Sequence, residues 1–403
     1  MAKGGKNHFE EFEDHTLLKH LILDKYVKSW AQKLLSWAEQ VWFVDAFAGE
    51  GGDQKGRPGS PLIAGRIAED LLSTVGLRVG RKAPMRVLAV ERDKERCKRL
   101  EAAMQPYIGC KPPIAAVRCG TLSERLDVFI QHIGRAPVLF FLDPFGVDGL
   151  LVDDLPKLLS GPQNEVFALF SDVGAKRLHA TLLTEERDID YEVQQVQSAP
   201  SLFPDMDEEA AASKKKEVER STAALRSTQQ ASQRILVEAL GPSAIAEVDG
   251  VSADERPAKL TQIYLRRLRE AGAKFVISFP VRDRRSSNVY QLVHASKSKA
   301  GLRTMKESMQ SALNGSSLPS EVREAISFEL RGNEYAVTEE IRAHFKGKEI
   351  RWTVGNNRGD EATVKKYLLE ETPIFPGQFE TIKQALIDAG QCTQRRPLTF
   401  NFT

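Results

Sequence analysis

VDAFAGEGG, residues 44–52, joins the end of an apolar run to a cluster of glycines. The run itself, VWFVDAF (41–47), consists of strand-forming residues and contains one acidic side chain. This pattern is typical of a buried parallel strand that feeds a loop. Glycine is needed in such a loop because the backbone must bend tightly and approach a ligand with no Cβ in the way. We therefore expect a ligand site that includes Asp45, Phe47, Gly49 and Gly51.

Similar short apolar runs recur along the chain, and segments with helical spacing separate them. The runs are RVLAVE (86–91), IAAVRC (114–119), PVLFFLD (137–143) and EVFALFS (165–171). Strands that alternate with helices predict a parallel α/β sheet wound through right-handed crossovers. Ahead of the first strand, apolar residues recur at helical spacing over 11–40, which predicts a helix with one buried face.

Two further runs predict a hairpin at the end of this sheet. KFVISFPV (274–281) and VYQLVHA (289–295) are joined by the polar turn RDRRSSN, so at least one of the two strands runs antiparallel to its neighbour. Seven strands with a terminal hairpin match the sheet of the common methyltransferase fold. We therefore predict a Rossmann-type, seven-stranded, methyltransferase-like sheet. This is an analogy of fold, and it does not establish an activity.

The ends of the second and third strands predict an adenosine-binding pocket. Glu91 ends the second strand, where a carboxylate can accept hydrogen bonds from both ribose hydroxyls of an adenosine ligand. Thr121 follows the third strand, where this fold often places a polar contact to the adenine. The alternative is that Glu91 is only an exposed side chain at a strand end. With the glycine loop, this pattern predicts S-adenosylmethionine as the cofactor, and no metal site is expected.

FFLDPFG (140–146) predicts the reacting end of the pocket. Its apolar residues bring the chain out of the sheet at Asp143, and Pro144 fixes φ just beyond. Ligands of open α/β sheets bind outside the carboxyl ends of the strands, so Asp143 and Phe145 are expected to face the pocket. There a carboxylate can orient an amino or hydroxyl nucleophile, and an aromatic ring can stack on a base. The alternative is that Asp-Pro starts a turn and Phe145 belongs to the core.

The first predicted helix and two arginine clusters carry further candidates. His15 and Lys19 lie on that helix and are candidates for catalysis, although a lone helical histidine is usually a surface residue. The arginine clusters could contact the phosphates of a nucleic acid, or they could be ordinary surface. They comprise Arg266, Arg267 and Arg269, and then Arg282, Arg284 and Arg285.

The charge, the cysteines and the apolar runs of the chain exclude several classes of protein. A formal net charge of +2 over 403 residues gives no support to indiscriminate phosphate binding, which usually needs a strongly basic domain. The four cysteines have neither zinc-finger nor redox-motif spacing, so we interpret them as reduced thiols. No apolar run is long enough to span a membrane, and the start lacks a signal-peptide core. We therefore expect a cytoplasmic protein that does not engage a membrane.

The length predicts two or three domains. We assign residues 1–180 and 259–310 to the methyltransferase-like domain. The helix-forming stretch 181–258 is expected to be a helical insertion. After a polar linker, residues 319–403 combine helices with a short final strand, which predicts a winged-helix-like domain.

Four stretches carry a resemblance to a known family: HTLLKHLILDKYVKSW, VDAFAGEG with GSPLIA, FLDPFGVDGL and YQLVHASKSKAGLRTMKESM. They resemble the three-Cys-motif partner proteins (TcmP). The resemblance implies a methyltransferase-like domain, a C-terminal winged-helix-like region and a partner protein that bears the three cysteines. Glu50 departs from the family, where proline is more common at this position. The residues that match the family's motifs are His15, Lys19, Asp45, Gly49, Gly51, Ser60, Pro61, Asp143, Pro144 and Gly146.

Two functions follow from these patterns. The first is a methyltransferase that acts with a three-Cys-motif protein and has nucleic acid as a candidate acceptor. Its catalytic candidates are Asp143, Pro144, Phe145, Lys19 and His15. The second is a non-catalytic partner or scaffold that recognises nucleic acid or the three-Cys protein. The Asp-Pro-Phe-Gly motif matches the Asp-Pro-Pro-Tyr type of amino-methyltransferase site only in part. Both the catalytic and the non-catalytic function therefore stay open.

Overall fold

The computed structural model divides the chain into two compact units. Unit 1 comprises Met1–Pro144, Asp154–Phe170 and Leu265–Thr403, and unit 2 comprises Phe145–Asp153 and Ser171–Tyr264. Within them the structure describes residues 14–53, 55–76, 83–144, 146–183, 204–283, 289–314, 326–328, 334–353, 363–396 and 398–402.

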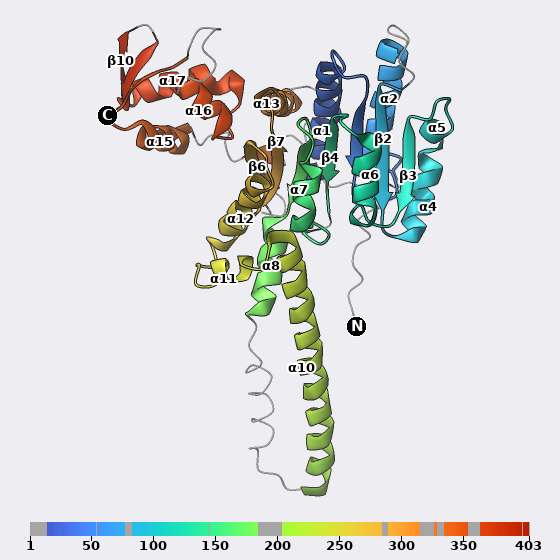
Figure 1. Ribbon diagram of the computed structural model, residues 1–403. Helices are drawn as coiled ribbons and strands as arrows, with labels where there is room; N and C mark the ends of the chain where they lie inside the picture. Colours follow the sequence, from blue (N-terminus) through green and yellow to red (C-terminus); the bar gives the residue numbers. More distant parts are fainter. Residues whose placement is uncertain are drawn as a thin grey trace. The chain divides into compact units, whose positions relative to one another are not determined.

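An eight-stranded sheet organises unit 1 (Figure 1). Its strands, in spatial order, are β3 (Ala115–Cys119), β2 (Met85–Glu91), β1 (Val41–Asp45), β4 (Val138–Leu142), β5 (Glu165–Phe170), β7 (Val289–Ser296), β6 (Phe275–Asp283) and β8 (Ile326–Phe328). The first five strands are parallel, and β7 runs antiparallel to both β5 and β6. The predicted Rossmann-type, methyltransferase-like sheet is therefore confirmed.

Two details of the prediction need correction. The sheet has an eighth strand, because β8 pairs antiparallel with the outer edge of β6. These residues were expected in the C-terminal domain. The first helix ends at Leu34 instead of continuing to residue 40, because a turn follows in which the N–H of Trp37 donates to the Leu34 carbonyl. The turn of the predicted hairpin, residues 284–288, lies outside the described residues.

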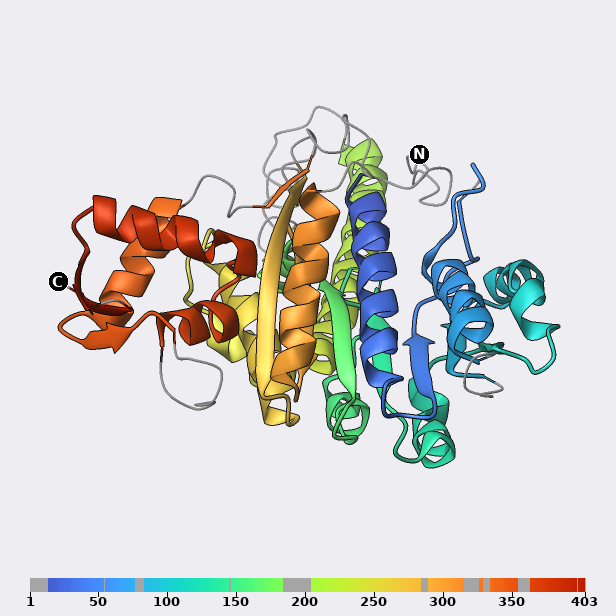
Figure 2. The same cartoon turned by 90° about the horizontal axis from the view of Figure 1, so that it is seen from above.

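Helices connect the strands and cover the sheet. In unit 1 they are α1 (Asp14–Leu34), α2 (Ser60–Leu71), α4 (Lys94–Ala103), α5 (Gln105–Ile108), α6 (Leu126–Ile133), α7 (Leu155–Leu158) and α13 (Lys299–Asn314). Helices α1 and α13 lie side by side (Figure 2). The last helix before β6, α12 (Arg256–Glu270), begins in unit 2 and ends in unit 1.

The faces of the sheet follow from the alternation of side chains along β1. Trp42 packs edge-on against Phe129 of α6, with ring centroids 5.5 Å apart. The next residue, Phe43, points to the other face and belongs to the same core as Tyr26 of α1. Asp45 is two residues further on and shares the face of Phe43. The strand therefore delivers Asp45 to the side of the sheet that α1 covers.

The C-terminal part of unit 1 has a hydrophobic core of its own around Trp352. Its elements are α15 (Glu334–Phe345), β9 (Glu349–Arg351), α16 (Val364–Glu370), α17 (Phe379–Asp388), β10 (Cys392–Arg396) and β11 (Thr399–Phe402), and the strands form one sheet in the order β10-β11-β9. The buried Lys306 of α13 reaches this part, because its Nζ donates to the carbonyls of Leu368, Thr372 and Ile374 at 2.8, 2.5 and 3.1 Å. Assignment to the winged-helix class stays a prediction.

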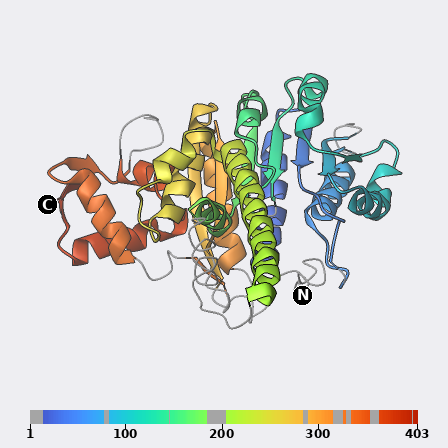
Figure 3. The ribbon, with the colours of Figure 1, turned by 90° about the horizontal axis from the view of Figure 1, so that it is seen from below.

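Unit 2 is helical. It contains α8 (Asp172–Leu182), α10 (Pro204–Leu240) and α11 (Ala244–Val248), and α8 packs against α10. Helix α10 runs for 37 residues without interruption (Figure 3). Its many Ala, Glu, Lys, Arg and Gln residues are strong helix formers, which accounts for its length. The domain boundaries given in the sequence analysis stay predictions.

Candidate functional site

The carboxyl ends of β1, β2 and β4 form the part of the sheet where a ligand is expected. Strand β1 lies between β2 and β4. The chain winds from β1 toward β3 on one side and from β4 toward β5 on the other, so the strand order reverses between β1 and β4. In open α/β sheets, ligands bind outside the carboxyl ends of the strands at such a switch point.

An ion pair lies at this switch point. Lys19 of α1 donates through Nζ to Oδ2 of Asp143, the residue that follows β4. Only 7% of the Lys19 side chain and 17% of the Asp143 side chain are exposed. Both residues are catalytic candidates from separate parts of the sequence, and the structure brings them together. A pair this sheltered is screened less by salt than a surface pair.

Asp45 lies beside this pair at the end of β1 and is fully buried. Its Oδ1 accepts the N–H of Phe47 at 3.2 Å, and the Ser60 hydroxyl also donates to its carboxyl. Its Oδ2 has no hydrogen-bond partner. Burial raises the pKa of Asp45 to about 7, the charge of Asp143 adds to the shift, and Ser60, Phe47 and Lys19 oppose it.

Asp45→Asn is expected to gain stability relative to the wild type as the pH rises. A carboxyl whose pKa is higher in the folded than in the unfolded protein binds its proton more tightly when folded, so unfolding becomes easier as the pH rises from about 4 to about 7. At about 1.4 kcal/mol per pH unit, the difference between variant and wild type should grow by about 2–3 kcal/mol from pH 5 to pH 8. Urea unfolding at both pH values measures it, and an unchanged difference would show that Asp45 titrates normally.

Glu91 connects the ends of β1 and β2. Its Oε2 accepts the N–H of Gly49 at 2.9 Å, and its Oε1 accepts the N–H of Asp93 at 2.9 Å. A carboxylate has about four lone-pair positions, so each oxygen keeps capacity for a further donor. Asp93 in turn caps α4, because its side chain accepts from the N–H of Arg96. The carboxylate of Glu91 is thus fixed in place with acceptor capacity to spare.

The glycine loop depends on glycine at two positions. Gly49 and Gly51 have φ values of +61° and +95°, a region that side-chain-bearing residues rarely adopt. A Cβ at Gly51 would also lie 3.1 Å from the Cβ of Ala103 on α4. The two glycines therefore let the loop fold back between β1 and α4.

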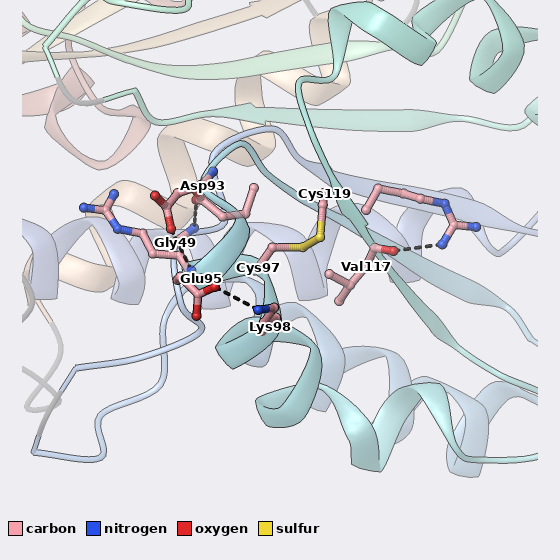
Figure 4. Close-up of a disulfide and its surroundings, with 10 residues drawn as sticks. Gly49, Asp93, Glu95, Cys97, Lys98, Val117 and Cys119 are labelled. Atoms are coloured by element: carbon pink, nitrogen blue, oxygen red, sulfur yellow. Dashed lines mark hydrogen bonds and ion pairs between the residues drawn. A yellow bond between two sulfur atoms is a disulfide. The ribbon is translucent and has the colours of Figure 1, made fainter.

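A disulfide joins Cys97, in α4, to Cys119, the last residue of β3 (Figure 4). The interpretation of these two cysteines as reduced thiols was wrong, whereas Cys110 and Cys392 are free. The bond ties the helix that follows Glu91 to the strand that precedes Thr121. Disulfides are rare in cytosolic proteins. The cysteines therefore no longer favour the predicted cytoplasmic location, which stays a prediction.

Cys97→Ser is expected to lower the free energy of unfolding by about 3 kcal/mol, because the disulfide closes a loop across a sequence separation of 22 and restricts the unfolded chain. A reducing agent should destabilise the wild type by a similar amount and leave the variant unchanged. Cys392→Ser is the control, because it removes a free and buried thiol but keeps the disulfide. It should lose as much stability on reduction as the wild type does. Equal unfolding midpoints of the wild type with and without reductant would contradict the expectation.

The remaining predicted residues lie as follows. Thr121 is exposed, and its N–H faces Glu124 at 3.4 Å. Pro144 is buried. Phe145 and the side chain of His15 lie outside the described residues. The roles given to all the predicted site residues stay predictions.

The sequence patterns do not reveal several polar groups of this region. Ser60, a candidate only through the family resemblance, hydrogen-bonds through its side chain to Asp45. Tyr26, Glu165 and His294 form a buried polar cluster beneath α1. The sequence signals this cluster only by placing Glu165 at the start of the apolar strand β5 and His294 within the apolar strand β7.

Of the predicted phosphate-binding arginines, those of α12 have acidic or carbonyl partners, whereas the side chains of Arg282, Arg284 and Arg285 lie outside the described residues. Arg267 forms an ion pair with Glu270 at 2.9 Å, and Arg266 lies 3.5 Å from the same carboxylate. Arg269 donates to the Val276 carbonyl. In the described part of the chain, no group of three or more His, Cys, Asp or Glu side chains could hold a metal ion. No described helix is both long and apolar enough to cross a membrane.

Comparisons with known proteins add little to this description. No family model and no curated protein match the chain. One similar solved structure is that of a protein assigned as a sarcosine dimethylglycine methyltransferase from Galdieria sulphuraria, with 11% identity, coverage of 67% of this chain and 85% of that chain, and a TM-score of 0.21. Another is a geranyl diphosphate methyltransferase in complex with GPP and sinefungin, with 12% identity, coverage of 67% and 78%, and a TM-score of 0.21. Because both TM-scores are far below 0.5, the fold is assigned from the strand order of the sheet alone.

Proposed function

We propose that the chain is an S-adenosylmethionine-dependent methyltransferase. The observation that supports this most is the position of Glu91, at the end of β2, with its carboxylate hydrogen-bonded to Gly49 of the loop after β1. An acidic residue there is placed to accept ribose hydroxyls, and a glycine loop allows close approach of the ligand. The Lys19–Asp143 pair lies at the neighbouring strand end, where an acceptor molecule would be held.

The bound cofactor would supply an electrophilic sulfonium methyl group. The residues of this chain would position the two reactants. Glu91 and the glycine loop would hold the adenosine end of the cofactor, and Asp143 and Lys19 would orient the nucleophile of the acceptor. Holding two reactants in line is a large part of catalysis in such reactions. Asp45 and Ser60 would act indirectly, since their hydrogen bond joins the end of β1 to the start of α2.

Glu91→Ala is expected to weaken binding of S-adenosylhomocysteine by about 1.5–3 kcal/mol, the range for hydrogen bonds to a charged group. Isothermal titration calorimetry measures the change. Glu95→Ala is the matched control, because Glu95 is an exposed glutamate at the start of α4. Circular dichroism of both variants shows whether the loop held by Glu91 remains folded. Equal affinity of a folded Glu91→Ala variant and the wild type would place the ribose elsewhere.

The acceptor and the partner are further parts of the proposal. The family resemblance in the sequence supports a three-Cys-motif protein as partner and nucleic acid as a candidate acceptor. Purified chain with radiolabelled cofactor, incubated with cellular nucleic acids in the presence and absence of that partner, tests both. Label in nucleic acid would support the proposal. Cofactor binding with no label in any fraction would favour a binding or scaffold role instead.

A further inference from the structure

The acceptor end of the proposed site carries a lysine ammonium group as well as a carboxylate. Lys19 Nζ contacts Asp143 Oδ2, and both side chains are mostly buried. The buried, ionisable Asp45 also lies beside this pair. Three ionisable side chains from α1, β1 and the end of β4 therefore surround the place where a nucleophile would be oriented.

An exocyclic amine is poorly matched to this arrangement. Its nitrogen becomes more positive as it takes a methyl group from a sulfonium, and its N–H groups need hydrogen-bond acceptors. The ammonium group of Lys19 has three donors and no acceptor, and it would repel a nitrogen that gains positive charge. Lys19 also occupies an oxygen of Asp143 that would otherwise accept an N–H.

A hydroxyl group matches it well. Negative charge develops on the oxygen as its proton leaves, and a fixed cation beside that oxygen stabilises the charge. Oδ2 of Asp143 is held by Lys19, which leaves Oδ1 to take the proton. We propose, on the basis of the proposed function, that the methyl acceptor is a hydroxyl-bearing molecule and that Lys19 is a catalytic residue of O-methyl transfer.

The bond changes balance without a further reactant. The acceptor O–H bond breaks and its proton passes to the carboxylate of Asp143. A lone pair of the acceptor oxygen forms the new O–CH3 bond, while the C–S bond breaks and its electron pair stays on sulfur. The products are a methyl ether and S-adenosylhomocysteine, and Asp143 afterwards releases its proton to solvent.

Identification of the methylated atom tests the inference. The full chain is incubated with methyl-labelled cofactor and, in separate reactions, with total cellular RNA, cellular DNA and a small-molecule extract. Labelled products are hydrolysed and identified by mass spectrometry, and the expected product carries the methyl group on oxygen. A product methylated on nitrogen would overturn the inference and leave the proposed function standing. If calorimetry shows cofactor binding but no reaction gives label, both the inference and the enzymatic function are contradicted.

Variants of Lys19 then test its role. Lys19→Met is expected to lower the rate at least about a hundredfold, the size of effect seen when one donor to a developing oxyanion is removed. Lys19→Arg should restore part of that rate, because it returns a cationic donor. Lys28→Met is the matched control, since Lys28 is an exposed lysine of the same helix. A Lys19→Met variant that binds S-adenosylhomocysteine normally and keeps the wild-type rate would overturn the assignment.

Discussion

Asp143→Asn is expected to lower the rate of methyl transfer at least about a hundredfold, the low end for loss of an acid–base group. Asparagine has nearly the same volume, so the fold and the affinity for S-adenosylhomocysteine should be unchanged. It has no negative charge, however, and therefore cannot take the acceptor's proton or form an ion pair with Lys19. Turnover with labelled cofactor and calorimetry on the same preparation measure the two quantities separately.

Asp127→Asn provides the matched control for this variant. Asp127 is an exposed aspartate of α6 that pairs with Lys157 on the surface, and an exposed pair of this kind contributes little to stability. Its replacement should therefore leave turnover and affinity unchanged. If Asp143→Asn also turned over at the wild-type rate, the catalytic assignment would move from Asp143 to Lys19 and His15.

The second large effect is expected from the buried cluster of Tyr26, Glu165 and His294. Oε2 of Glu165 accepts from the Tyr26 hydroxyl and lies 2.9 Å from His294 Nε2, and the Tyr26 hydroxyl lies 3.1 Å from the same nitrogen. All three side chains are buried. Burial and the neighbouring Glu165 raise the pKa of Tyr26 well above its usual value, so the tyrosine stays a neutral donor.

Glu165→Ala is expected to lower the free energy of unfolding by about 3–5 kcal/mol, the cost of removing one member of a buried pair. The loss is large because Glu165 contacts both Tyr26 and His294 in a buried site, and its removal leaves these two polar groups only their contact with each other. Urea unfolding followed by circular dichroism measures it. Tyr26→Phe should cost less, about 1–2 kcal/mol, and Glu101→Ala, at an exposed position of α4, should cost almost nothing. A loss below about 1 kcal/mol for Glu165→Ala would show that the cluster stabilises little beyond packing.

The sheet could be predicted because its signals are local. Each of the strands β1–β5 is a short apolar run next to a helical pattern, and β6 and β7 are joined by a polar turn. The third strand of that edge, β8, could not be predicted, because it is only three residues long and pairs through its backbone. An apolar run is therefore enough to predict a strand. The pairing of a short edge strand such as β8 depends instead on whether the folded sheet leaves the edge of β6 free.

The sequence names Lys19 and Asp143 as separate candidates, but it could not predict that their side chains meet. Lys19 and Asp143 are 124 residues apart, and their contact depends on which turn of α1 lies over the end of β4. The disulfide depends on the register that places Glu91 opposite Cys119, so that the helix after β2 passes over the end of β3. Tertiary packing determines such contacts, so they cannot be predicted from the spacing of residues in the sequence.

We expect Glu91 and the glycine loop to bind the adenosine part of S-adenosylmethionine. Isothermal titration of the purified wild-type chain with S-adenosylhomocysteine tests it most directly, because the measurement needs neither the acceptor nor the partner. We predict saturable binding with one site per chain. Absence of measurable heat or saturation, for a chain shown to be folded by circular dichroism, would contradict the proposed cofactor site.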